Sequence, residues 1–237
     1  MSSNEKKVWG LFRRSDSQKA DLLEAAKRYH AAYRGSPAES YLHHRGLGEA
    51  AGRFKIGYVS DPIPGHDQYR GRLVIPYLRP AGGLDHVATI RFRCIAAACT
   101  KNPDGSWREE EHHPEHGKYL GLPGDPPMLF NTQALIEASP HVGLTEGEFD
   151  AMSSELSGVP ASGLPGVSSW RDYFAPAFAG FRSVFVLGDG DDAGIKFADA
   201  MAARLPNAKP CAMPPKLDVN TFVRINGPEK YRERLGV

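Results

Sequence analysis

The chain has 237 residues, of which 41% are hydrophobic and 24% are charged, which is enough for one large domain or two small ones. No stretch approaches 18 uninterrupted apolar residues and the N-terminus has no hydrophobic signal core, so we expect neither a membrane span nor a signal peptide. Three cysteines, an odd number, are typical of a reducing cytoplasm. Residues 1–130 have 19 Lys and Arg against 15 Asp and Glu, whereas residues 131–237 have 10 against 13.

Two helices are predicted near the N-terminus. Residues 16–32 have apolar side chains at helical spacing, and the Gly-Ser-Pro at 35–37 ends this pattern. Ser36 is an expected N-cap for a second, short helix through His44, with Glu39 completing a capping box. We expect residues 1–35 to form an N-terminal helical segment.

The next elements read as strands. Alternating residues predict a strand over 54–59, and residues 73–77 and 86–93 flank a turn, which predicts a hairpin. Side chains alternate along a strand, so Arg91 and Arg93 share one face, which Arg72 of the partner strand can join. The alternative is a solvated face of an antiparallel sheet. Residues 94–117 form a polar, irregular insertion, and order resumes at Lys118 and Tyr119.

Strands and helices alternate after residue 141. We expect strands over 142–145, 159–162, 184–187 and 208–213, and helices over 148–157, 169–178, 193–205 and 219–225. Such alternation predicts a parallel sheet with right-handed crossovers. The apolar run 184–187 is typical of a strand buried on both faces.

Acidic residues follow the ends of these strands. Glu146 follows the first strand, Asp189 and Asp191 follow the buried strand, and Asp218 precedes the last helix, where it can act as a cap. Asp150 lies one helical turn after Glu146. Because ligands bind at the carboxyl edge of such sheets and like charges repel, we expect Mg²⁺ or Mn²⁺ there. The alternative for the Asp-Gly-Asp stretch is a solvated acidic turn.

These motifs resemble a known family. The segments EGEFDA at 146–151, LGDGDDAG at 187–194 and DVN at 218–220 resemble the topoisomerase–primase (Toprim) domain. Upstream, YLHHRGL at 41–47, FKIGY at 54–58, GRLVIP at 71–76 with Arg91, KYL at 118–120 and LFN at 129–131 are similar to bacterial DnaG-type primases. The resemblance implies an α/β protein, with an α+β subdomain containing an antiparallel hairpin over 36–130 and a Toprim-type parallel sheet over 131–237.

The resemblance also implies roles for single residues. Glu146 would be the acid–base group or a metal ligand, and Asp189, Asp191 and Asp218 would hold two divalent cations, Mg²⁺ or Mn²⁺, with Asp150 supporting them. The residues implied to contact the single-stranded DNA template, the NTP or the nascent RNA primer are Arg72, Arg91, Lys118 and Tyr119. The implied activity is synthesis of short RNA primers by nucleotidyl transfer.

The sequence departs from the family in three ways. No cysteine precedes Cys94 and the sequence stops at Val237, so we expect a protein without the family's amino-terminal zinc-ribbon and without its helicase-binding domain. Asn131-Thr132-Gln133 stands where a basic residue is expected after Phe130. We therefore expect a cytoplasmic, phage-like catalytic core, in a bacterium or a phage-infected cell, that works with a separate zinc-ribbon protein and the replicative helicase. Binding to single-stranded DNA would then be weak and salt-sensitive.

The insertion contains one more pattern. Cys94, Cys99, His112 and His116 have the spacing of a two-cysteine, two-histidine zinc site, although the usual apolar residues between the ligand pairs are absent. The alternative is a polar loop with solvated histidines, and the sequence favours it.

Other functions remain compatible with the Toprim motifs. A Toprim nuclease would use the same cations for hydrolysis, and a recombination mediator would use the domain to bind DNA without catalysis. A topoisomerase is disfavoured because the chain has no room for a separate DNA-cleavage domain.

Overall fold

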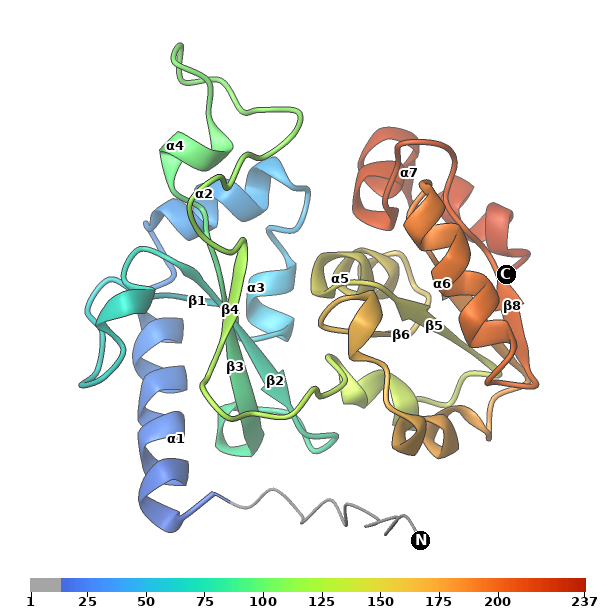
Figure 1. Cartoon of the computed structure of the whole chain (residues 1–237), viewed down its shortest axis with the longest axis horizontal. Helices are drawn as coiled ribbons and strands as arrows, with labels where there is room; N and C mark the ends of the chain where they lie inside the picture. The colour runs from blue at the N-terminus through green and yellow to red at the C-terminus, as the bar shows by residue number, and fades with distance from the viewer. Residues whose placement is uncertain (1–13) are drawn as a thin grey trace, which may run out of the picture.

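Two four-stranded sheets, each with its own helices, make up residues 14–237, the part of the chain that the structure describes (Figure 1). The coordinates are a computed structural model. We call residues 14–121 the antiparallel half and residues 141–237 the parallel half. The expected mixed α/β fold is confirmed, whereas the expected division at residue 130 stays a prediction. No helix among residues 14–237 is long and apolar enough to cross a membrane.

The sheet of the antiparallel half has the strand order β1-β2-β3-β4. Its strands are β1 (Gly57–Tyr58), β2 (Leu73–Leu78), β3 (Val87–Arg93) and β4 (Tyr119–Gly121). β2 and β3 form the predicted hairpin, in which Ile75 lies opposite Arg91. The strand expected from residue 54 is wrong at its start, because Phe54 ends a helix and Lys55 turns the chain at φ 55°.

Helices cover both faces of this sheet. They are α1 (Asp16–Ala31), α2 (Pro37–His44) and α3 (Ala50–Arg53). α1 packs Leu22, Ala26 and Tyr29 against Val74 and Phe92 of the hairpin. The capping box predicted at α2 is wrong, because the Ser36 hydroxyl donates to the Tyr33 carbonyl and the Glu39 carboxylate instead accepts the Gly35 N–H at 2.7 Å.

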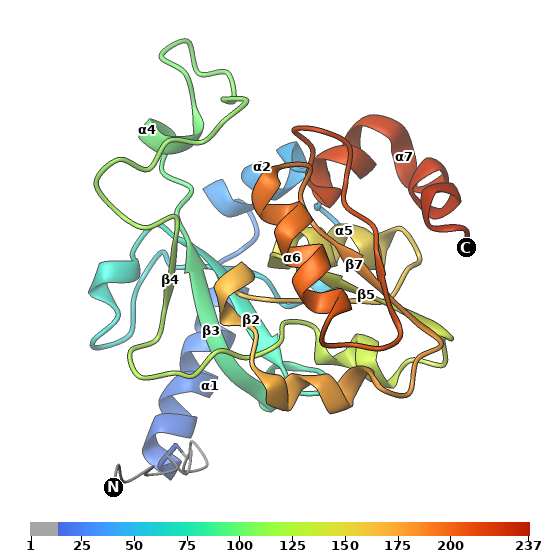
Figure 2. The ribbon, with the colours of Figure 1, turned by 45° about the vertical axis from the view of Figure 1, so that its right-hand side comes forward.

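The insertion, residues 94–117, rises above the antiparallel sheet (Figures 1 and 2). It starts directly after β3, forms the short helix α4 (Ala97–Thr100) and then runs irregularly to β4, as its polar sequence predicts. The backbone holds its two arms together, because the His112 N–H donates to the Cys99 carbonyl at 3.0 Å and the Cys94 N–H donates to the Lys118 carbonyl at 2.8 Å.

The sheet of the parallel half has the order β6-β5-β7-β8, and every neighbouring pair is parallel. Its strands are β5 (His141–Thr145), β6 (Ala161–Gly163), β7 (Ser183–Leu187) and β8 (Ala208–Pro210). All five residues of β7 are buried, which confirms the prediction from its apolar run. The last strand ends at Pro210, although the N–H groups of Cys211 and Met213 still donate to the Val186 and Gly188 carbonyls, both at 2.8 Å.

The parallel half has three long helices. They are α5 (Glu148–Leu156), α6 (Asp192–Ala202) and α7 (Val219–Leu235), the last interrupted at Gly227 with φ 86°. The helix expected over 169–178 is present only as a 3-10 helix, Asp172–Phe178, which contains Pro176, a residue without an N–H to donate. The 3-10 turns of the described chain are Asp67–Tyr69, Leu84–His86, Thr132–Ile136, Val167–Ser169 and Asp172–Phe178.

One hydrophobic cluster joins the two halves. Tyr41, Ile75 and Tyr77 of the antiparallel half pack with Phe149 and Met152 of α5, all of them buried. Truncating a buried aromatic side chain typically costs about 3–5 kcal/mol, so this shared core holds the halves firmly together. The Tyr41 ring of α2 lies 6.1 Å from the Phe149 ring of α5, between centroids. The carboxyl edge of the parallel sheet faces the antiparallel half (Figure 1).

Candidate active site

Five carboxylates meet at the carboxyl edge of the parallel sheet: Glu146, Asp150, Asp189, Asp191 and Asp218. We call them the acidic edge. Thr145 lies opposite Leu187 in the parallel register, so the residues that follow β5 and β7 reach the same edge. The Asp189 N–H donates to the Glu146 carboxylate at 2.8 Å. The acidic residues predicted from separate loops therefore do come together.

The turn after β7 needs its glycines. A Cβ atom at Gly190 would lie 1.8 Å from the Pro214 carbonyl oxygen, and one at Gly194 would lie 2.1 Å from the Asp189 carbonyl oxygen. No side chain fits at these positions, because the chain passes too close to its neighbours. The Asp-Gly-Asp stretch can thus fold tightly and place Asp189 and Asp191 at the same edge of the sheet.

Two of these aspartates cap helices. Asp191 accepts the Gly194 N–H at 2.8 Å at the start of α6, and Asp218 accepts the Thr221 N–H at 2.6 Å at the start of α7. The cap expected at Asp218 is confirmed. Each cap uses one carboxylate oxygen and fixes the side chain at the N-terminus of its helix. The second oxygen of Asp191 remains available to a ligand, whereas the second oxygen of Asp218 lies 3.6 Å from the Arg45 guanidinium.

The negative charge of the acidic edge is poorly compensated. Burial, followed by the Asp150, Glu146 and Asp218 carboxylates, raises the pKa of Asp189 to about 8. Burial and Asp218 raise the pKa of Asp150 to about 7, although Asp150 accepts the Asn220 N–H at 3.0 Å. The Oδ1 atom of Asp189 is buried and has no hydrogen-bond partner. Such a group is costly unless it binds a proton or a cation.

The donor set of the acidic edge fits divalent cations that also bind substrate. Among residues 14–237, no three of its carboxylates bring their ligand atoms within 4.8 Å of one another. Mg²⁺ usually takes one or two carboxylates and completes its octahedron with water and substrate phosphates. Hard oxygen ligands that are spread in this way, with an unpaired Asp189 oxygen among them, suit Mg²⁺ or Mn²⁺.

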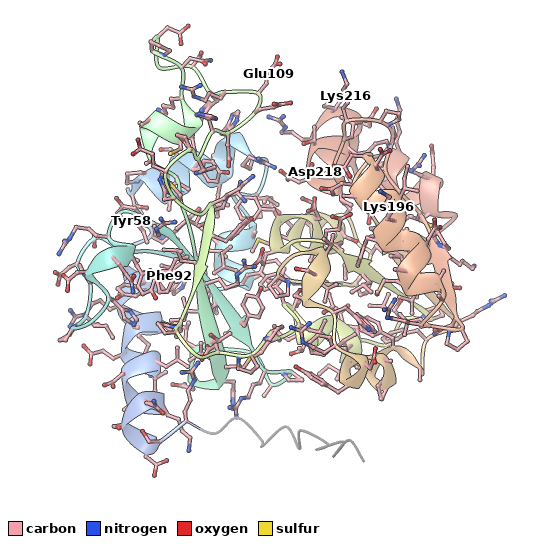
Figure 3. All side chains as sticks on the ribbon, in the orientation of Figure 1. Tyr58, Phe92, Glu109, Lys196, Lys216 and Asp218 are labelled. Carbon is pink, nitrogen blue, oxygen red and sulfur yellow. The ribbon has the colours of Figure 1, made fainter. Side chains whose placement is uncertain are left out.

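Arg45 faces the acidic edge from the antiparallel half. Its guanidinium lies 3.6 Å from Asp218, donates to the Asn220 side chain at 2.8 Å and lies 3.7 Å from Glu111 of the insertion. Figure 3 shows Asp218 between the two halves. Arg45 is not among the site residues predicted above, and its signal in the sequence is its position within the YLHHRGL motif.

Arg91 and Arg93 share one face of β3, as predicted, but both are engaged within the protein. Arg91 pairs with Glu148 of α5 and its guanidinium lies 4.6 Å from the centre of the Tyr119 ring. Arg93 is buried, with only 3% of its side chain exposed, and donates to Glu111 at 2.8 Å and to the Tyr41 hydroxyl at 2.8 Å. Arg91 thus links the hairpin to the helix that follows Glu146.

Glu111 is the centre of a second charged group, the Glu111 cluster: Tyr41, Arg45, Arg93, Glu111 and Lys118. Lys118 lies 3.3 Å from Glu111 and its side chain is 43% exposed. The Tyr119 hydroxyl accepts a hydrogen bond from Arg93. Of the two nucleic-acid contacts predicted at the start of β4, Lys118, which precedes the strand, is half-exposed, whereas Tyr119 is fixed beneath the two arginines.

Arg72 lines a cleft beside the insertion. Tyr58, Arg70, Lys101 and Trp107 line the same cleft. The Lys101 ammonium lies 4.6 Å from the centre of the Trp107 ring, and Arg72 donates to the Gly117 carbonyl at 3.3 Å. Cations interleaved with aromatic rings are what proteins use to hold single-stranded nucleic acid without reading its sequence.

Asn131 has a structural role in place of the expected basic residue. Its side-chain amide donates to Glu155 and to the Ala161 carbonyl, both at 2.8 Å, and the residue is buried. A basic side chain at this position could not make both contacts and reach the solvent. The chain therefore uses this position to fix β6.

Three of the four residues predicted for zinc lie together, and the fourth assignment is wrong. Cys94, Cys99 and His116 form a cluster with His113 rather than His112. His112 is exposed, because its backbone bond to Cys99 turns its side chain outward and its neighbour inward. The observed spacing is Cys-x4-Cys-x13-His-x2-His.

Comparison with known proteins places the chain in a family. The Gene 57 protein of Mycobacterium phage D29 is 40% identical over 168 residues, which cover 70% of this chain and 99% of that protein. The chain belongs to the family of this phage protein. No protein-family model matches the sequence.

Solved structures identify the fold as that of the DnaG primase catalytic core. The RNA polymerase domain of Mycobacterium tuberculosis DnaG matches with a TM-score of 0.71 and 19% identity, over 94% of this chain and 84% of that one. The E. coli primase catalytic core matches with a TM-score of 0.70 and 20% identity, over 92% and 79%. A DnaG catalytic domain bound to single-stranded DNA matches with a TM-score of 0.69 and 20% identity, over 94% and 82%.

Proposed function

We propose that this protein is a primase catalytic core that synthesises short RNA primers on a single-stranded DNA template from NTPs. The observation that carries the proposal is the acidic edge on this particular fold, with an unpaired, buried Asp189 oxygen at its centre. A cleft of arginine, lysine and aromatic side chains lies in the other half of the same molecule. The division into an α+β subdomain over 36–130 and a Toprim-type domain over 131–237 is part of this proposal.

The reaction joins two nucleotides. The 3′-hydroxyl of one attacks the α-phosphate of the next in line, and pyrophosphate leaves. Divalent cations, when bound, would lower the pKa of the hydroxyl and neutralise the charge of the leaving group. Asp189, Asp191 and Asp218 are the residues that would hold them.

Glu146 has the surroundings of an acid–base group. Burial and the nearby Asp191 carboxylate raise its pKa, although the Asp189 N–H holds one of its oxygens. A carboxylate with a raised pKa is a better proton acceptor at neutral pH. Glu146 would therefore accept the proton of the attacking hydroxyl, and Asp150 would support the edge from behind.

Basic side chains of the antiparallel half would hold the template and the nucleotide. Arg72 and Lys118 are accessible and would contact phosphates. Arg91, paired with Glu148, and Tyr119, bonded to Arg93, would help to position the template and the nucleotide. Contacts of this kind fix a backbone without choosing a sequence. We propose that sequence choice and loading come from a zinc-ribbon protein and the replicative helicase, acting in trans.

A synthesis assay distinguishes this function from its rivals. The protein is incubated with a single-stranded template, labelled NTPs and Mg²⁺ or Mn²⁺, and the products are separated by length. New oligoribonucleotides that require the template support a primase. Shortened template without synthesis indicates a nuclease, and DNA binding with neither product indicates a recombination mediator; either result overturns the proposal.

A further inference from the structure

The insertion brings together two thiols and two imidazoles, the ligand types of structural zinc sites. The Nε2 atom of His116 lies 3.1 Å from the Cys94 sulfur and 3.6 Å from the Cys99 sulfur. One ligand atom from each of Cys94, Cys99, His113 and His116 lies within 4.8 Å of all the others. With Zn–S of about 2.3 Å and Zn–N of about 2.0 Å, a tetrahedron has sulfur–nitrogen edges of about 3.5 Å.

His113 has one ring nitrogen that nothing in the protein uses. Its Nε2 lies 3.3 Å from a Glu111 carboxylate oxygen, while its Nδ1 is buried without a hydrogen-bond partner. With the proton on Nε2, the imidazole donates to Glu111 and presents the lone pair of Nδ1. Histidine ligands of zinc are characteristically oriented by a carboxylate in this way.

Ordinary packing does not account for this arrangement. Cys94 and Cys99 are buried free thiols and behave as small apolar groups when they only fill space. Packing alone would leave the buried Nδ1 atom of His113 without a partner, which costs free energy. A metal ion satisfies both thiolates and both rings at once.

We propose that Cys94, Cys99, His113 and His116 bind one Zn²⁺ ion. All four positions are protein ligands, so the site is closed and structural rather than catalytic. The ion joins the end of β3, helix α4 and the loop that leads to β4. His113 contacts Glu111, so a zinc ion that fixes His113 also helps to hold Glu111 against Arg93 and Lys118. These residues lie beside the cleft that Arg72 lines.

This site is separate from the acidic edge and does not depend on the proposed function. Its ligands are thiolates and imidazoles, which favour zinc, whereas the carboxylates of the acidic edge favour Mg²⁺ or Mn²⁺. The two sites therefore respond to different metals and to different substitutions.

The test is the metal content of the purified full chain, prepared without chelator. We expect about one equivalent of zinc by elemental analysis, lost in Cys94→Ser, Cys99→Ser, His113→Asn and His116→Asn. The matched controls His112→Asn and Cys211→Ser should retain it. Loss of zinc in His112→Asn with retention in His113→Asn would overturn the assignment.

Cobalt gives a second readout that does not require folded variants. Wild-type protein in which Co²⁺ replaces zinc should show tetrahedral d–d bands and thiolate-to-cobalt absorption, and equimolar Zn²⁺ should abolish both. A folded wild-type chain that contains no zinc and shows no such bands with Co²⁺ would refute the site. So would a Cys94–Cys99 disulfide found in protein that was purified under reducing conditions.

Discussion

The acidic edge brings carboxylates together, whereas in the Glu111 cluster three cations surround a single carboxylate. Burial raises the pKa of Asp189 to about 8, and four neighbouring carboxylates add to the effect. Burial opposes the charge of Glu111 too, but Arg93 and Lys118 outweigh it and hold the pKa of that carboxyl well below its usual range. The compensated carboxylate of Glu111 stabilises the fold, whereas under the proposed function the uncompensated carboxylates of the acidic edge would bind a divalent cation.

Neutralising one acidic side chain should separate chemistry from folding. We expect Asp189→Asn or Asp191→Asn to lower primer synthesis by at least about 10³-fold, because each removes a cation ligand. The fold should stay intact or become slightly more stable, because each change removes a repelling charge. Near wild-type synthesis in both variants would show that the acidic edge is not the site of the reaction.

The same kind of change in the Glu111 cluster should have the opposite effect. Glu111→Ala leaves the buried Arg93 guanidinium without its carboxylate, so the free energy of unfolding in urea should fall by about 3–5 kcal/mol. Glu109→Ala, two residues away and exposed, should change it by less than about 0.5 kcal/mol. Equal effects of the two substitutions would contradict the structural role of Glu111.

The pH dependence of stability should also distinguish the two regions. Asp189 and Asp150 have raised pKa values, about 8 and about 7, so the folded state holds protons that the unfolded state has released above pH 4. Without divalent cations, the melting temperature should therefore fall as the pH rises from 5 to 8. Added Mg²⁺ should raise the melting temperature more at pH 8 than at pH 5. Asp189→Asn should flatten this slope; an unchanged slope would argue against the charge balance described.

The smallest expected effect is on DNA binding. Arg72→Ala should weaken binding of single-stranded DNA and reduce the slope of log affinity against log salt concentration by roughly 0.7 to 1, the loss of about one phosphate contact. Lys196→Ala, on the exposed face of α6, is the matched control and should leave the slope unchanged (Figure 3). Fluorescence anisotropy with a labelled oligonucleotide at several salt concentrations measures both.

The sequence predicts the acidic edge well because strand ends are local signals. The buried run 184–187 is followed directly by Asp-Gly-Asp, so the two aspartates lie at the edge of the sheet whatever elements the sheet packs against. Long-range partners are not visible in this way. Arg45 reaches Asp218 across 173 residues, and Glu148 pairs with Arg91 across 57, so these contacts depend on how α2, α5 and the hairpin pack together.

The zinc ligands show a limit of spacing arguments. Two adjacent histidines, His112 and His113, both satisfy a loose pattern, and only the backbone bond between His112 and Cys99 determines which ring turns inward. Likewise, the capping box at Ser36 fails because the hydroxyl finds a carbonyl of the preceding turn. In both cases a single hydrogen bond outweighs the motif.

Binding of Mn²⁺ to the acidic edge tests the central claim most directly, namely that uncompensated charge marks the cation site. Electron paramagnetic resonance counts free Mn²⁺ in a titration of the wild type, of Asp189→Asn and of Cys94→Ser. We predict that the wild type and Cys94→Ser bind Mn²⁺ alike and that Asp189→Asn binds it much more weakly. Unaltered Mn²⁺ binding by Asp189→Asn would contradict the account.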